Sequence, residues 1–105
     1  MSGWVVIAAY RPKPGHEERV RELVRSHTPR LREAGLVTDR EPIIAVAKDG
    51  TFVECFEWVE GGVERAHVHP DVLTMWAEFG EVCDYVSLRD LAESAELFAG
   101  FSALP

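Results

Sequence analysis

Apolar residues gather in extended runs along the chain, and these runs predict the strands of a sheet. The first run covers 4–11, where β-branched side chains dominate, and the second covers 42–47. The third run, 51–59, alternates between two faces that both carry apolar side chains. An Asp-Gly pair at 49–50 is a strong hairpin signal, so the second and third strands are predicted to pair. A last strand is predicted over 96–104.

Helical periodicity separates these runs. Apolar side chains form one stripe from 20 to 34, and Pro29 within that stripe predicts a kink or a restart capped by Thr28. After two glycines, a short helix is predicted over 63–68, and a longer helix begins with Pro70 in its first turn. A final short helix is predicted from a sequence that resembles a capping box, at 87–90.

The order of predicted elements is β-α-β-β-α-β, the ferredoxin-like arrangement of the α+β class. Helices would cover one face of a four-stranded antiparallel sheet. The other face carries too many apolar side chains to be left in water, and large apolar patches usually mark an interface. We therefore expect one domain over 1–105 that pairs its sheet with that of a second copy, giving a homodimer with the form of a dimeric α/β barrel.

The net charge and the lengths of the apolar runs argue against two kinds of partner, nucleic acid and membrane. The net charge of −7 argues against a nucleic-acid partner. No apolar run approaches the ~20 residues that a membrane span needs, so no membrane partner is expected. The first residues lack a basic region ahead of an apolar stretch, so no secretory signal is expected. Cys55 and Cys83 have neither CxxC nor metal-ligand spacing, which favours two free thiols in a cytoplasmic protein over a disulfide.

The end of the third strand carries the strongest hint of a small-molecule site. Glu57 and Trp58 end that strand, and His67 follows the two glycines. This order can place a carboxylate, an indole and an imidazole around one cavity. His67 is the predicted general base, and Glu57 is predicted to orient it through a hydrogen bond. The alternative is that the same hydrogen bond only ties a helix to the strand, because buried polar groups need partners in any case.

Aromatic side chains are the predicted walls of this site. Four of them are the candidates for substrate binding: Trp58, Tyr10, Trp76 and Phe56. Aromatic residues also dominate ordinary cores, so packing is the alternative for each. His67 and His69 suggest a metal site, but a helical segment would separate the two imidazoles, and no further His or Cys stands at zinc spacing. We predict no metal ligands and interpret His27, on the first apolar stripe, as a paired boundary histidine.

Over nearly its whole length the chain resembles the antibiotic-biosynthesis-monooxygenase-like family of dimeric α/β-barrel proteins. The similarity rests on the strand and turn at 5–15, the Glu-Trp pair at 57–58 and the Ala-His pair at 66–67. It implies two ferredoxin-like sheets paired into a barrel. It also implies a monooxygenase that acts on a small aromatic, quinol or polyketide-like substrate without metal, haem or flavin.

Two other functions were weighed against this one. The match to the haem-degrading branch of these proteins fails, because the position of the axial histidine falls within 75–78, where the chain has Met, Trp, Ala and Glu. The second alternative is a non-catalytic barrel that binds a small molecule or serves a stress response. In that protein the predicted catalytic pair would be structural, and fold similarity alone does not decide between the two.

Overall fold

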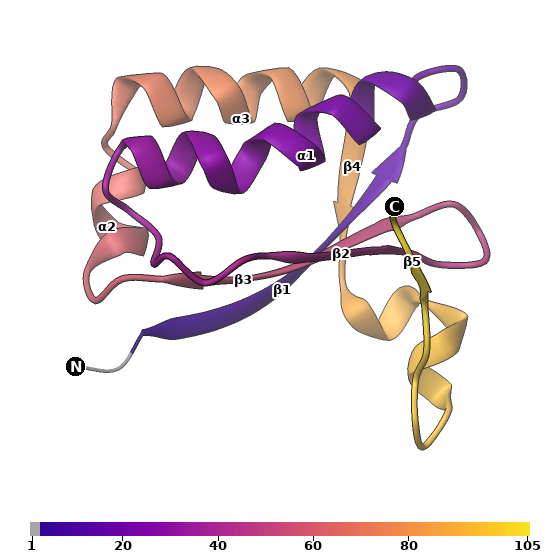
Figure 1. The fold of residues 1–105 in the computed structure, drawn as a ribbon. Coiled ribbons are helices and arrows are strands. Elements are labelled where there is room, and N and C mark those ends of the chain that lie inside the picture. Colours follow the sequence, from indigo (N-terminus) through magenta and orange to yellow (C-terminus); the bar gives the residue numbers. More distant parts are fainter. Residues whose placement is uncertain (1–2) are drawn as a thin grey trace.

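Two layers build the fold, which the computed structural model describes for residues 3–105 (Figure 1). Helices α1 (Glu17–Glu33) and α3 (Pro70–Val82) cover one face of a sheet, and the short helix α2 (Gly62–Ala66) lies between the sheet and α3. The strands, in chain order, are β1 (Trp4–Pro12), β2 (Ile43–Val46), β3 (Phe52–Trp58), β4 (Cys83–Val86) and β5 (Ser102–Ala103).

The sheet is antiparallel throughout, with the strand order β4-β1-β3-β2-β5. Its first four strands have the ferredoxin-like order, so the predicted α+β class and arrangement agree with the structure. The longest pairing joins β1 to β3, from Trp4 opposite Trp58 to Tyr10 opposite Phe52. Because side chains alternate along a strand, this register fixes which residues of both strands face the helices.

The hairpin between β2 and β3 forms as predicted. Gly50 adopts a left-handed backbone, with φ of 91°, which glycine accepts without steric cost. The Asp49 carboxylate accepts a hydrogen bond from the Thr51 N–H at 2.9 Å, and the Ala47 N–H donates to the Thr51 carbonyl at 2.8 Å. These contacts close the turn and set the register of the two strands.

The prediction of a last strand over 96–104 is wrong. The fourth strand of the ferredoxin-like order is β4, which follows α3 without a loop. It forms there because the edge of β1 lies beside the end of α3: the Lys13 N–H donates to the Val82 carbonyl at 2.8 Å, and Pro12 stands opposite Cys83. Only Ser102 and Ala103 of the predicted strand pair with the sheet, at the edge of β2.

The predicted restart at Pro29 is also wrong, since α1 continues through it, and the predicted kink stays a prediction. Pro29 and Arg25 are both exposed, so the Arg25 carbonyl, which loses its helical donor, lies on the side of the helix that water reaches. Thr28 does not cap a new turn, because its hydroxyl donates to Glu54 of β3 at 2.8 Å. The short helix predicted at 87–90 is a 3₁₀ turn whose Ser87 makes no capping hydrogen bond.

The two faces of the sheet are covered unequally. The face toward the helices carries the main core, in which Phe56 of β3 packs with Phe79 and Met75 of α3. On the other face, Leu91 and Phe101 from the segment after β4 cover only one end. Four apolar side chains of this face stay uncovered or half-covered, and we call them the open sheet face: Val5, Ile7, Ile43 and Cys55. Within residues 3–105, no helix is both long and apolar enough to cross a membrane.

Candidate functional site

A cavity of about 360 Å³ lies between the sheet and the two long helices. Its walls are mostly aromatic, and its polar atoms are few. The lining side chains come from β1, β3, β4, α1 and α3: Val6, Ala8, Tyr10, His27, Phe56, Trp58, Trp76, Phe79 and Tyr85. An apolar cavity with a small number of placed polar groups is the usual form of a small-molecule site.

Glu54 is the buried carboxylate behind one wall of this cavity. The alternation of β3 places it on the helix face between Phe52 and Phe56, and no part of it reaches solvent. Three donors converge on it: the Tyr10 hydroxyl at 2.7 Å and the His27 Nδ1 at 2.8 Å on Oε1, and the Thr28 hydroxyl at 2.8 Å on Oε2. Burying an unpaired carboxylate would cost several kcal/mol, and these hydrogen bonds offset that cost.

The hydrogen bonds of His27 fix its tautomer. The Trp76 indole Nε1–H donates to the His27 Nε2 at 3.1 Å. An indole nitrogen can only donate, so Nε2 carries no proton. The proton of the neutral ring therefore lies on Nδ1, which donates it to Glu54. His27 is thus held as a neutral imidazole whose one lone pair, on Nε2, is occupied by Trp76.

Tyr10 and Tyr85 are the two phenols of the cavity wall, with ring centroids 5.6 Å apart. Burial, followed by the nearby Glu54 carboxylate, raises the pKa of Tyr10 well above its ordinary value. Burial and the neighbouring Cys83 thiol raise the pKa of Tyr85 to about 12. Both phenols therefore stay neutral near neutral pH, and the Tyr10 hydroxyl donates to Glu54. Tyr10, Glu54, His27 and Trp76 form one continuous chain of hydrogen bonds, which we call the acid–base cluster.

The structure brings all four predicted substrate-binding side chains to this one cavity. Tyr10 and Phe56 reach it from β1 and β3, Trp58 from the end of β3, and Trp76 from α3. Trp58 and Trp76 meet edge to face with centroids 6.5 Å apart. Their part in binding a substrate stays a prediction.

The predicted hydrogen bond between Glu57 and His67 is wrong. Trp58 faces the helices, so its neighbour Glu57 faces the opposite side of the sheet. There Glu57 accepts hydrogen bonds from the Arg40 Nε and the Thr38 hydroxyl, each at 2.9 Å, and these donors lower its pKa. His67 is exposed on the helix side, where its Nδ1 bonds the Val63 carbonyl at 2.8 Å. The two side chains are not brought together, and their catalytic role stays a prediction.

Sequence reasoning missed Glu54 and gave His27 a structural role only. The signal was present in both elements. Glu54 is the one ionisable residue on a strand face that otherwise carries Phe52, Phe56 and Trp58, and His27 interrupts an apolar helical stripe. Two polar groups on apolar faces of neighbouring elements must find partners, and the partner of each is most simply the other.

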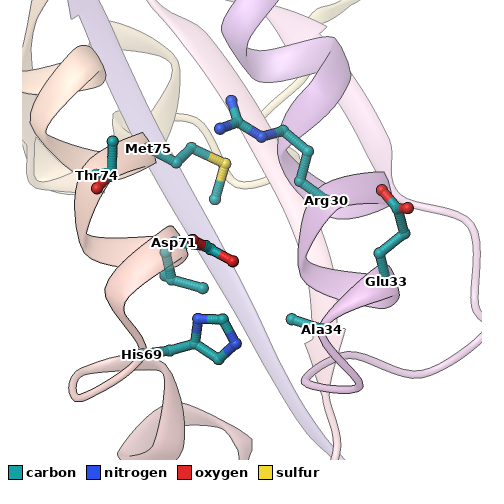
Figure 2. Close-up of a pocket in the computed structure, with 8 residues that line it drawn as sticks. Arg30, Glu33, Ala34, His69, Asp71, Thr74 and Met75 are labelled. Atoms are coloured by element: carbon teal, nitrogen blue, oxygen red, sulfur yellow. The ribbon is translucent and has the colours of Figure 1, made fainter.

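A second cavity, of about 510 Å³, lies between α1 and the start of α3 (Figure 2). His69, Asp71 and Met75 point toward α1, and Arg30 and Glu33 stand opposite. No predicted site residue lines this cavity. The Nδ1 of His69 is buried there without a hydrogen-bond partner. Across residues 3–105, no three His, Cys, Asp or Glu side chains are grouped so that they could hold a metal ion.

Together, the fold and the smaller cavity define a class: a small α+β protein with an aromatic cavity whose wall contains a buried acid–base cluster. No family model, no curated protein and no solved structure matches the chain. The resemblance to the monooxygenase-like family therefore stays a prediction, and function has to be argued from the cavity itself.

Proposed function

We propose that the protein is a cofactor-free monooxygenase that acts on a compact aromatic, quinol or polyketide-like molecule held in the aromatic cavity. The observation that carries this proposal is the buried Glu54–His27 pair in the cavity wall. A carboxylate that fixes the tautomer of an imidazole, beside an apolar space, is the arrangement of a general base with its orienting partner.

The size and lining of the cavity support a flat, mostly apolar ligand. A volume of about 360 Å³ is at the small end of ligand sites, which suits a molecule of two or three fused rings. Phe56, Trp58 and Trp76 offer ring faces and edges for stacking against such a molecule. The few polar atoms, on His27 and the two tyrosines, would set its orientation.

The proposed reaction uses the base and dioxygen alone. His27 takes a proton from an acidic CH₂ or hydroxyl of the substrate, and Glu54 stabilises the imidazolium that forms. The resulting carbanion is oxidised by dioxygen to a hydroperoxide on the same carbon. Loss of water from that hydroperoxide leaves a carbonyl, so one oxygen atom enters the product and the other leaves as water. The substrate supplies all four electrons, and no separate reductant is needed.

We also propose that two copies pair through the open sheet face, as the dimeric barrel requires. Ile7, Cys55 and Ile43 stand side by side across three neighbouring strands, and Ile7 and Ile43 are 50% and 68% exposed. Leu97 and Phe98, 92% and 90% exposed, lie in the loop that projects on this helix-free side (Figure 1). A self-complementary apolar face of this kind is what a two-fold interface uses.

The activity proposal is tested by oxygen uptake with a panel of quinols and anthrone-like phenols. We expect His27→Gln to lower the rate by ~10²–10⁴-fold, because the base is lost while the ring's volume is nearly kept. The matched control is His16→Gln, an exposed histidine before α1 that makes no capping hydrogen bond and does not line the cavity, and it should leave the rate within about twofold. Equal losses in both variants would contradict the assignment of His27. Binding of the panel without oxygen uptake by the wild type would favour the non-catalytic binding protein.

A further inference from the structure

A ligand that binds the acid–base cluster would donate a hydrogen bond to the lone pair on His27 Nε2. In the protein alone, this lone pair already accepts a hydrogen bond from the Trp76 indole. Nδ1 is committed to Glu54, and Nε2 accepts the Trp76 indole N–H. Both His27 and Trp76 line the cavity, so their hydrogen bond lies at its wall. A ligand can engage His27 only if this bond is exchanged.

We propose that Trp76 is an exchangeable donor, whose N–H the hydroxyl of a neutral phenol-type ligand replaces on His27. The inference rests on the proposed function, because it concerns the same cavity. It adds the chemical requirement that the ligand must itself donate a hydrogen bond. An ether or a ketone of the same shape has only hydrogen-bond acceptors. If it displaced Trp76, its oxygen lone pair would face the lone pair of His27 Nε2; otherwise the bond between Trp76 and His27 stays in place.

The surroundings of Trp76 allow such an exchange. The indole is only half-buried, whereas His27 is fully buried and packed edge-on against Phe56 and Phe79, with centroids 5.4 and 5.1 Å away. The fixed partner is therefore the imidazole, and the partner with room to turn is the indole. Trp76 also packs against the exposed His67 ring at 5.1 Å, on the solvent side of the helix layer.

The exchange costs the hydrogen bond between Trp76 and His27, so only a ligand that replaces this bond can bind His27. A ligand hydroxyl gains one hydrogen bond to Nε2, but the indole loses one, so the net gain in the wild type is small. If the indole N–H is removed, Nε2 becomes a buried acceptor without a partner, and the same hydroxyl then gains a full hydrogen bond. Removing the donor should therefore favour a hydroxyl ligand over its methyl ether, whereas the lost indole ring affects the stacking of both compounds alike.

The test compares 1-naphthol with 1-methoxynaphthalene by calorimetry, without oxygen so that no turnover occurs. We expect the ratio of the 1-naphthol affinity to the ether affinity to be roughly threefold to tenfold higher in Trp76→Phe than in the wild type, with the ether alone reporting the stacking area that the smaller ring loses. The matched control is Trp4→Phe, the same replacement at an indole that is 66% exposed and does not line the cavity. That control should change neither affinity.

A second measurement needs no variant. In the wild type, the nuclear magnetic resonance signal of the Trp76 indole N–H should shift further with 1-naphthol, which breaks its hydrogen bond to His27, than with the ether, which causes only a ring-current shift. An indole signal that shifts equally with both bound compounds, or the same ratio of the two affinities in Trp76→Phe as in the wild type, would overturn the exchange while leaving the proposed binding function intact. Failure of both compounds to bind would instead overturn the proposed function and the exchange with it.

Discussion

At the scale of single residues, Glu54 organises the interior. It lies between two phenylalanines of β3 and accepts hydrogen bonds from β1 and from two consecutive residues of α1. These bonds orient Tyr10 and His27, and through His27 they reach Trp76. The stability of the helix–sheet contact and the geometry of the candidate site therefore depend on the same carboxylate. A change that weakens one is expected to weaken the other.

The two tyrosines give a pH prediction at this scale. Their folded pKa values are raised, so above the ordinary value of ~10 the unfolded chain loses protons that the folded protein keeps. The free energy of unfolding should therefore fall as pH rises beyond that point. Tyr10→Phe should remove the larger part of this fall, and Tyr85→Phe the smaller part.

Denaturant unfolding at a series of alkaline pH values measures the fall, and ultraviolet absorbance of the phenolate reports ionisation directly. Only two tyrosines are present in the chain, so in Tyr85→Phe the signal belongs to Tyr10 alone. Ionisation of Tyr10 near pH ~10 in the folded Tyr85→Phe variant would contradict the burial of that phenol.

At the scale of elements, the alternation of the strands and the residues of the turns could be predicted from the sequence. The boundary between α3 and β4 could not. The Asp49–Gly50 turn and Pro70 at the start of α3 carry local signals that the structure confirms. No glycine or proline separates α3 from β4, and Cys83 extends the apolar stripe of the helix by one position. Only the edge of β1, which is far away in the sequence, decides that the chain turns extended there.

The candidate site likewise has one part that could be predicted from the sequence and one part that could not. The aromatic walls were predictable, because Tyr10, Phe56 and Trp58 belong to strands with a clear alternation. The pairing of Glu54 with His27 was not, because it depends on how α1 is placed over β3, and 26 or more residues separate the partners. The prediction for Glu57 failed by one strand position, which is enough to move a side chain to the opposite face.

Alanine substitutions at two glycines, one in α2 and one in α3, compare a crowded position with an open one. A Cβ at Gly62 would lie 2.3 Å from the Leu36 carbonyl oxygen, a backbone atom that cannot move aside cheaply. A Cβ at Gly80, inside α3, would meet nothing within 4 Å. We expect Gly62→Ala to lower the free energy of unfolding by about 1–3 kcal/mol. Gly80→Ala should raise it by about 0.5–1 kcal/mol, because alanine favours a helix.

Urea unfolding of the two variants against the wild type measures both effects, with an unchanged slope as the control for two-state behaviour. Equal effects of the two substitutions would show that the close approach of Gly62 to Leu36 is not a constraint on the fold.

At the scale of the whole molecule, the sheet separates two surfaces with different roles. The helix side encloses the cavity, and the helix-free side carries the open sheet face. The two do not compete for the same side chains, since Val6, Ala8 and Tyr10 face the cavity while Val5 and Ile7 face outward. Pairing of two copies would therefore leave the lining of the cavity unchanged.

This separation leads to a prediction about assembly. Sedimentation at micromolar concentration should give twice the chain mass for the wild type and the chain mass for Ile7→Asp, because the new charge would be buried in the interface. Leu73→Asp is the matched control, an exposed leucine on α3 that does not line the cavity, and it should stay dimeric. A monomeric wild type would contradict the dimer, and a dimeric Ile7→Asp would contradict this choice of face.

The short outer strands have a consequence of their own for how the chain behaves when it is crowded. β5 offers only two residues at one border of the sheet, and at the other border β4 pairs with residues 9–12 of β1 alone, so one edge of β1 stays unpaired over residues 4–8. Fibril growth requires rows of free backbone donors and acceptors, since each added chain must extend the ladder at a border. β3 is enclosed between β1 and β2, but residues 4–8 of β1 have a strand on one side only. The free edge of β1 at residues 4–8 is therefore the part of the sheet on which amyloid-like stacking would begin.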